Sequence, residues 1–210
     1  MERGKAPIIG IVGGIASGKS LIAGQFERQG AAVVSADALA HEVLKFDEVK
    51  RRARVRWGDA VFSADGEIDR SALAKIVFAP PPDGPRELIH LEQLTHPEIG
   101  RLARERLQAL GRENAVPAVV LDVPLLFESG WNKFCDKIVY VDAPRETRLW
   151  RALGRGWTRE EFDRRETAQQ SLETKRDQAD LVIDNSGSPQ LTQAQVDRYL
   201  QSLVDPPQPH

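Results

Sequence analysis

The chain has 210 residues, and its 29 Lys plus Arg against 31 Asp plus Glu give a formal net charge of -2. Apolar residues make up 41% and charged residues 29%, an ordinary soluble globular mixture that excludes a disordered chain. The length is enough for one α/β domain with an inserted lobe and too short for two full-sized domains. The slight acidity disfavours general nucleic-acid binding. No apolar stretch approaches the roughly 20 residues that span a bilayer, and residues 8–12 are too short for a secretory signal, so we expect a cytoplasmic protein and no membrane partner.

Five short apolar runs predict the strands of a parallel sheet. They span residues 8–12, 31–34, 119–123, 138–142 and 181–183. Helical segments separate most of them, which is typical of a sheet covered by helices on both faces. The first run is followed by a predicted helix from about Lys19 to Gln29, which Gly30 ends.

Over 80 residues with little strand signal separate the second and third runs. Helices are expected near residues 38–44, 48–57, 71–78 and 97–110. The proline-rich residues 80–85 are expected to form a loop, because proline removes backbone donors and fixes φ. This stretch is too long for a simple crossover, so it predicts a helical insertion into the α/β core.

The strongest motif is a phosphate-binding loop. Residues 13–20 fit G-x-x-x-x-G-K-S/T, between a predicted strand and a predicted helix. Backbone N–H groups and the helix N-terminus attract phosphate oxygens there; Lys19 can reach the β- and γ-phosphates of ATP, and the Ser20 hydroxyl can bind Mg²⁺. The residues expected to hold ATP are Gly14, Ile15, Ala16, Ser17, Gly18, Lys19, Ser20 and Leu21. The loop alone does not decide the reaction, since switches, motors, hydrolases and small-molecule kinases share it.

Two acidic residues lie near the ends of predicted strands, where ligands of parallel sheets bind. Asp37 follows the second strand, and its carboxylate can accept the proton of an attacking hydroxyl; the alternative is that it caps the next helix. Asp122 ends the third strand, where it can hold Mg²⁺ through water or make only a local hydrogen bond.

An arginine-rich segment allows two main interpretations. Arginines recur every three or four residues, at Arg145, Arg148, Arg151 and Arg155. They can form a solvated face paired with neighbouring glutamates, namely Glu160, Glu161 and Glu166. Alternatively, the segment is a lid that closes over ATP, with Arg155 as the best candidate and Arg151 as the second for neutralising charge during phosphoryl transfer. Nucleic-acid binding is disfavoured by the overall charge.

Other side chains carry less information. The only cysteine, Cys135, excludes an intramolecular disulfide and is expected to be a packed thiol. The four tryptophans, at positions 57, 131, 150 and 157, are expected to pack rather than to stack on bases. The four histidines lack metal-ligand spacing.

The chain resembles the dephospho-coenzyme A kinase family over nearly its whole length. The matching segments are residues 13–20, 36–37, 66–70, 96–97, 121–131, 141–144 and 179–185, together with Arg151, Arg155 and Gln169. The Pro-Leu-Leu-Phe-Glu segment at 124–128 and the ending at 179–185 are far more specific than the phosphate loop, which many activities share.

This resemblance implies ATP-dependent phosphorylation of the ribose 3′-hydroxyl of dephospho-coenzyme A, the last step of coenzyme A biosynthesis. It implies a P-loop NTPase fold with a five-stranded parallel sheet flanked by helices. The expected core comprises about 1–37, 115–145 and 179–205, the helical acceptor-binding insertion about 38–114, and the lid about 146–178. It implies that Asp37 is the general base and that Lys19, Arg155 and Arg151 are further catalytic residues. The enzyme is expected to be a monomer.

The insertion is expected to contact the acceptor through Arg70 and His96. The alternatives are that Arg70 is a surface ion-pair partner and that His96, before Pro97, starts a helix.

The sequence departs from the family pattern at several positions. Ser35 replaces a usual Asp, Ala16 a usual glycine, Leu21 a usual threonine, Arg148 a usual glutamine and Arg165 a usual apolar residue, and the turn at 156–157 is one residue short. The expected catalytic residues remain, so we expect an active enzyme. The rival interpretations are another P-loop metabolite kinase, such as a nucleoside monophosphate kinase, and a non-catalytic nucleotide-binding protein.

Overall fold

The computed structural model describes residues 5–113 and 116–204, and the chain divides into two compact units. The first unit comprises the residues through Ser35 and those from Leu107 onward, and the second comprises Ala36–Arg106. The predicted core limits at residues 1, 115 and 205 lie outside the described residues.

The first unit contains a five-stranded parallel sheet, which confirms the predicted fold class. Its strands are β1 (Ile8–Gly13), β2 (Ala32–Ser35), β3 (Val119–Asp122), β4 (Lys137–Asp142) and β5 (Leu181–Asp184), in the spatial order β2-β3-β1-β4-β5. All six residues of the central strand β1 are buried, because a strand with neighbours on both sides and cover on both faces requires an apolar run.

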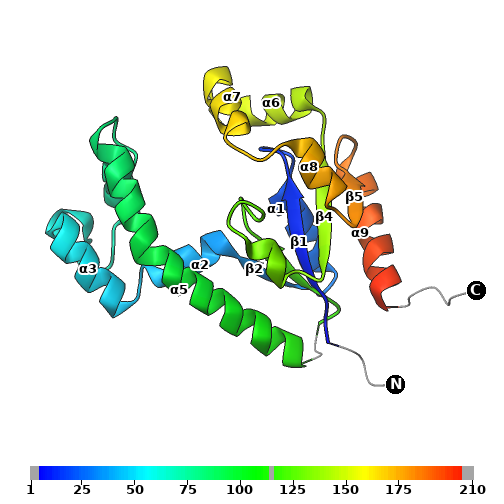
Figure 1. Cartoon of the computed structure of the whole chain (residues 1–210), viewed down its shortest axis with the longest axis horizontal. Helices are drawn as coiled ribbons and strands as arrows, with labels where there is room; N and C mark the ends of the chain where they lie inside the picture. The colour runs from blue at the N-terminus through cyan, green and yellow to red at the C-terminus, as the bar shows by residue number, and fades with distance from the viewer. Residues whose placement is uncertain (1–4, 114–115, 205–210) are drawn as a thin grey trace, which may run out of the picture. The chain divides into compact units, whose positions relative to one another are not determined.

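Two helices form a buried layer with this sheet. α1 (Lys19–Arg28) and α9 (Pro189–Val204) lie side by side, with Ile22 and Val196 fully buried in one cluster with strand residues such as Ile11 (Figure 1). Phe26 of α1 meets Tyr199 of α9 edge to face at 6.3 Å. The short helix α8 (Leu172–Asp177) lies beside β1.

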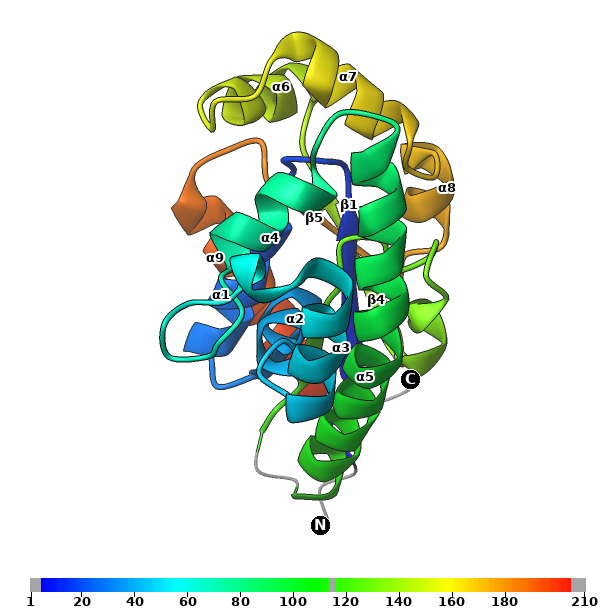
Figure 2. The same ribbon diagram turned by 90° about the vertical axis from the view of Figure 1, so that its left-hand side faces the viewer.

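The strand register brings polar residues to the carboxyl edge of the sheet. Ser35 is paired with Asp122, and Asp142 with Asp184. The first of the two helices that follow β4, α6 (Arg145–Leu153), packs against the second, α7 (Arg159–Thr167), as Figure 2 shows. The phosphate loop leaves the same edge from β1, so this edge positions the candidate site.

The second unit is helical, as predicted for the insertion. It contains α2 (Ala36–Val43), α3 (Asp47–Trp57), the short 3-10 turn η1 (Asp59–Val61), α4 (Arg70–Val77) and the first part of α5 (Asp83–Glu113). The Trp57 indole on α3 donates a 2.7 Å hydrogen bond to Glu87 on α5, and the two helices lie side by side in Figures 1 and 2.

The structure corrects one boundary in this unit. A helix starting near residue 97 and a loop through residue 85 were expected, but α5 begins at Asp83 and continues past Pro97. Pro85 falls in the first turn, where no intrahelical donor is needed, so it does not prevent the helix from starting. Pro97 removes one hydrogen bond from a helix of 31 residues, which the remaining bonds sustain.

Candidate active site

The phosphate loop connects β1 to α1 and holds a backbone shape that few residues adopt. Gly18, directly before α1, has φ +103°, and a Cβ there would lie 2.2 Å from the Asn185 amide nitrogen. Only glycine fits this position. The first turn of α1 contains no acidic residue, so the positive end of the helix is available to an anion.

Ala16 shows why glycine is usual at its position. Its φ is +57°, the left-handed region that L-residues avoid at a cost of about 1–2 kcal/mol. The methyl group is buried in a small cluster with Leu149, Ala152 and Phe162, which stabilises the loop in this strained shape. Alanine at position 16 therefore keeps the loop conformation, at the free-energy cost of a left-handed backbone.

Lys19 has an electrostatic environment suited to a phosphate. Its ammonium donates hydrogen bonds to the carbonyl oxygens of Gly13 and Gly14, both at 3.2 Å. Burial lowers the Lys19 pKa to about 8; Lys175 and Arg148 lower it as well, while Asp122 and Glu128 only partly offset this. A bound phosphate would supply the missing negative charge.

Arg148 is a buried cation beneath this loop. Its side chain is 4% exposed, pairs with Glu166 of α7 at 2.7 Å, and donates to the carbonyl oxygens of Ala143 at 3.1 Å and Ile15 at 3.5 Å. A solvated arginine face is therefore the wrong interpretation for Arg148. It does describe Arg145 and Arg165, which form exposed ion pairs with glutamates of α7.

Arg151 and Asn185 hold the other end of the loop. The Arg151 guanidinium donates to the carbonyl oxygens of Ser17 at 2.9 Å and Asn185 at 2.8 Å. The Asn185 side chain, itself buried, also donates to Ser17 O at 2.7 Å. Burial and the neighbouring Arg155 lower the Arg151 pKa. Arg155 lies just beyond α6 and is exposed.

A buried ion pair that sequence reasoning missed lies near Lys19. Lys175 of α8 is 3% exposed and pairs with Glu128 at 2.9 Å, and Glu128 also accepts a hydrogen bond from the Gln170 N–H. Burial opposes ionisation of Glu128, but these donors outweigh it and lower the pKa of that carboxyl. Glu128 ends the Pro-Leu-Leu-Phe-Glu segment; only that motif could have drawn attention to it.

The remaining predicted residues lie in the second unit. Asp37 is exposed and is the second residue of α2, so it lies in the first turn rather than at the capping position. Arg70 is exposed at the start of α4, where Asp69 is the N-cap. His96 is exposed inside α5, so the alternative that it starts a helix is wrong.

The donor set of the first unit fits Mg²⁺ in the way that phosphoryl-transfer sites hold it. Ser20 is exposed in the first turn of α1, and Asp122 ends β3. Mg²⁺ takes one or two protein oxygens and completes its shell with water and substrate phosphates, so a hydroxyl and a carboxylate suffice. Within residues 5–113 and 116–204, no group of three or more acidic, histidine or cysteine side chains could hold a metal by itself.

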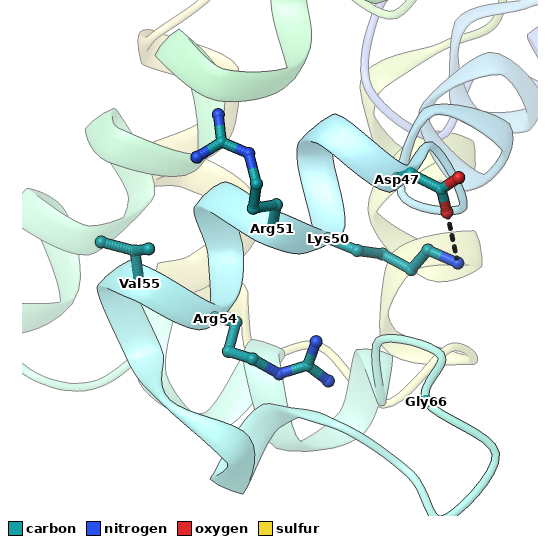
Figure 3. A pocket seen from close by; sticks show the side chains of 6 residues that line it. All are labelled: Asp47, Lys50, Arg51, Arg54, Val55 and Gly66. Carbon is teal, nitrogen blue, oxygen red and sulfur yellow. Dashed lines mark ion pairs between the residues drawn. The ribbon is translucent and has the colours of Figure 1, made fainter.

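A basic hollow in the second unit is not an anion site. It measures about 390 Å³ and is lined by α3 residues and by Gly66 (Figure 3). Lys50 pairs with Asp47 at 3.2 Å, as Figure 3 shows, and with Glu67 at 3.0 Å. Arg51 and Arg54 are likewise paired with carboxylates. These cations are neutralised by their neighbours, so the hollow offers no net positive charge.

Two predictions outside the loop can also be compared with the structure. Burial raises the Cys135 pKa to about 12, which keeps it a thiol, and its Sγ donates to Trp131 O at 3.8 Å. The expectation that every tryptophan packs is wrong for Trp150, which is 75% exposed.

In the described part of the chain, no helix is long and apolar enough to cross a membrane.

A parallel sheet with a phosphate loop between its central strand and the following helix, and with buried cations beside that loop, defines an α/β protein of the P-loop class. A solved shikimate kinase from Acinetobacter baumannii shares this fold, with a TM-score of 0.52 and 15% identity over 95% of this chain and 93% of that one. The dephospho-CoA kinase family model matches residues 7–190, and the chain belongs to this family.

Individual relatives agree with this assignment. A dephospho-CoA kinase of Symbiobacterium thermophilum is 42% identical over 90% of this chain and 78% of its own length, and one of Geobacter metallireducens is 43% identical over 90% and 92%. A solved dephospho-CoA kinase of Campylobacter jejuni has a TM-score of 0.72 and 25% identity, covering 95% of this chain and 98% of that chain. The family confirms the function expected from the sequence, ATP-dependent phosphorylation of dephospho-coenzyme A.

Proposed function

We propose that this enzyme transfers the γ-phosphoryl group of ATP to the ribose 3′-hydroxyl of dephospho-coenzyme A, with the triphosphate bound at residues 14–21. The observation that carries the proposal is the state of Lys19. Its ammonium is largely buried at the positive end of α1, has a lowered pKa and donates hydrogen bonds to two loop carbonyls. A polyphosphate is the ligand that satisfies such a cation.

The chemistry requires proton removal and charge neutralisation. Asp37 accepts the proton of the attacking 3′-hydroxyl, whose oxygen forms a bond to the γ-phosphorus as the bond from phosphorus to the β-γ bridging oxygen breaks. Among residues 5–113 and 116–204, the Asp37 carboxylate has no hydrogen-bond or ion-pair partner, so it is free to accept a proton. Arg155 and Arg151 neutralise the charge that develops on the transferred group.

The proposed site also binds Mg²⁺. When bound, Mg²⁺ would supply positive charge that offsets the negative charge of the triphosphate. The Ser20 hydroxyl would hold it directly and Asp122 through water, in keeping with the few protein oxygens that this ion takes. We also propose that residues 146–178 act as a lid, that Arg70 and His96 contact the acceptor, and that the enzyme is a cytoplasmic monomer.

A coupled ADP-release assay tests the acceptor. Purified enzyme with Mg·ATP is given dephospho-coenzyme A, adenosine or AMP, and the Lys19→Ala variant is the control. We expect release that depends on dephospho-coenzyme A and is lost in the variant. Turnover with AMP instead would favour a nucleoside monophosphate kinase. Nucleotide binding without turnover on any acceptor would favour a non-catalytic protein.

A further inference from the structure

Arg148 packs directly against the backbone of the phosphate loop. A Cβ on Gly14 would lie 2.8 Å from the Nη1 atom of Arg148 and 3.0 Å from its Cζ atom, so the guanidinium rests against the Gly14 backbone. The same Nη1 donates a 3.5 Å hydrogen bond to the carbonyl oxygen of Ile15. The guanidinium therefore contacts two consecutive residues of the loop.

Contacts outside the loop fix this guanidinium in place. Its Nε atom donates to the carbonyl oxygen of Ala143, just after β4, at 3.1 Å, and its Nη1 atom pairs with Glu166 of α7 at 2.7 Å. The fully buried ring of Phe162, also on α7, lies 5.7 Å from the centre of the guanidinium. A planar group held on several sides has little freedom to move, so it can set the position of the loop beside it.

The direction of one loop N–H follows from the contact with Arg148. The C=O and N–H of a trans peptide point to opposite sides, so an Ile15 carbonyl directed at Arg148 leaves the Ala16 N–H on the side away from the guanidinium. Ala16 itself has φ +57°, and a residue in this left-handed conformation turns neighbouring N–H groups toward a common point, where an anion can bind. The contact with Arg148 thus favours a loop shape that presents N–H donors to a phosphate.

We propose that Arg148 is a positioning residue for triphosphate binding, which holds the peptide between Ile15 and Ala16 with its N–H directed at the phosphates. This role rests on the proposed function, because it requires the phosphates of ATP to occupy residues 14–21. Arg148 acts through the loop backbone rather than by contact with a phosphate, since its Nε and Nη1 atoms are turned to Glu166 and to backbone carbonyl oxygens.

Calorimetry of the full chain with ATP and with inorganic tripolyphosphate, each with Mg²⁺, tests this role. We expect Arg148→Met to raise the Kd of both ligands by the same factor, about tenfold, because the loop N–H groups bind phosphates and not the base. Arg145→Met is the matched control, since Arg145 lies on the same helix and pairs with the same Glu166 at 2.9 Å, but is exposed. It should leave both Kd values within about twofold of wild type. The kcat of Arg148→Met at saturating ATP should stay within about threefold of wild type, because the loop holds the phosphates in the ground state and the transition state alike.

Arg148→Lys separates positioning from charge. Lysine keeps the positive charge but lacks the planar fork that reaches Ala143, Ile15 and Glu166 together, so it should recover only part of the lost affinity. Should Arg148→Met fail to fold, its combination with Glu166→Gln, which removes the buried carboxylate of the pair, is measured instead with the same expected weakening.

Four results would overturn the positioning role while leaving ATP binding by the enzyme established. They are unchanged affinity in Arg148→Met, weakening of ATP without tripolyphosphate, equal weakening in Arg145→Met, and full recovery in Arg148→Lys, which would mean that charge alone attracts the phosphates. Failure of the wild type to bind ATP would overturn both this role and the proposed function.

Discussion

Lys19→Met tests the electrostatic account of the phosphate loop through stability rather than activity. The Lys19 pKa is about 8 in the folded protein against an ordinary value of 10.5, mainly because of burial. Below pH 8 the ammonium is charged in both states, and the folded state bears the full cost of burying it. Between about pH 8 and 10.5 the folded state loses its proton while the unfolded state keeps it, so the free energy of unfolding rises with pH.

The expected size of this effect follows from the shift. Raising the pH from 7 to about 9.5 should add about 1–2 kcal/mol to the unfolding free energy of the wild type, after a reduction for partial solvent access to the ammonium. The Met variant lacks this titration, so the contribution should be absent from it. Other titrating groups are common to both proteins and cancel in the difference.

Urea denaturation of both proteins at the two pH values, without nucleotide, measures the effect. The wild type should gain stability relative to Lys19→Met as the pH rises. A stability difference that stays constant between the two pH values would show that Lys19 has an ordinary pKa, and the argument from its burial would be refuted.

Three further substitutions test individual roles. Asp37→Asn should bind ATP normally and lower kcat by about 10²–10⁴-fold, as loss of a general base does; a folded variant within about threefold of wild type would remove Asp37 from the chemistry. Arg155→Ala should lower kcat more than it raises the KM for ATP, whereas the exposed Arg159→Ala should be nearly silent; equal single-turnover rates for the two would refute the role of Arg155. Arg148→Met should lower the unfolding free energy by about 2–4 kcal/mol, because it removes the buried ion pair with Glu166, which keeps its exposed pair with Arg145, and the donor to the carbonyl oxygens of Ala143 and Ile15. The double variant with Glu166→Gln should lose less than Arg148→Met alone, and an equal or larger loss would contradict a coupled pair.

Local sequence patterns were sufficient to predict the sheet and the phosphate loop. Residues 8–12 form an apolar run bounded by glycine, and a central parallel strand must be buried on both faces, so the pattern and the structure agree. Lys19 and Ser20 follow at the fixed spacing that the loop requires. Proline signals were less reliable, because proline interrupts a helix only where its missing N–H is needed, and Pro85 falls in a first turn.

Contacts between distant residues could not be predicted in this way. Helical periodicity left open whether Arg148 belongs to a solvated face or to a lid, because its environment depends on Glu166 of α7, on Ala143 and on the loop carbonyl of Ile15. The hydrogen bond from Asn185 to Ser17 joins residues 168 positions apart. Side-chain type alone made Trp150 a core residue, whereas the orientation of α6 leaves it exposed.

The most direct test of the central claim is the identity of the product. Enzyme, Mg·ATP and dephospho-coenzyme A are incubated together, and the mixture is followed by phosphorus NMR and mass spectrometry. We predict that ADP and a second product form in equal amounts. This product is heavier than dephospho-coenzyme A by one phosphoryl group and carries a new phosphomonoester at the ribose 3′ position. ADP formed without this phosphomonoester, or the same product in the same amount from Lys19→Ala, would contradict the account.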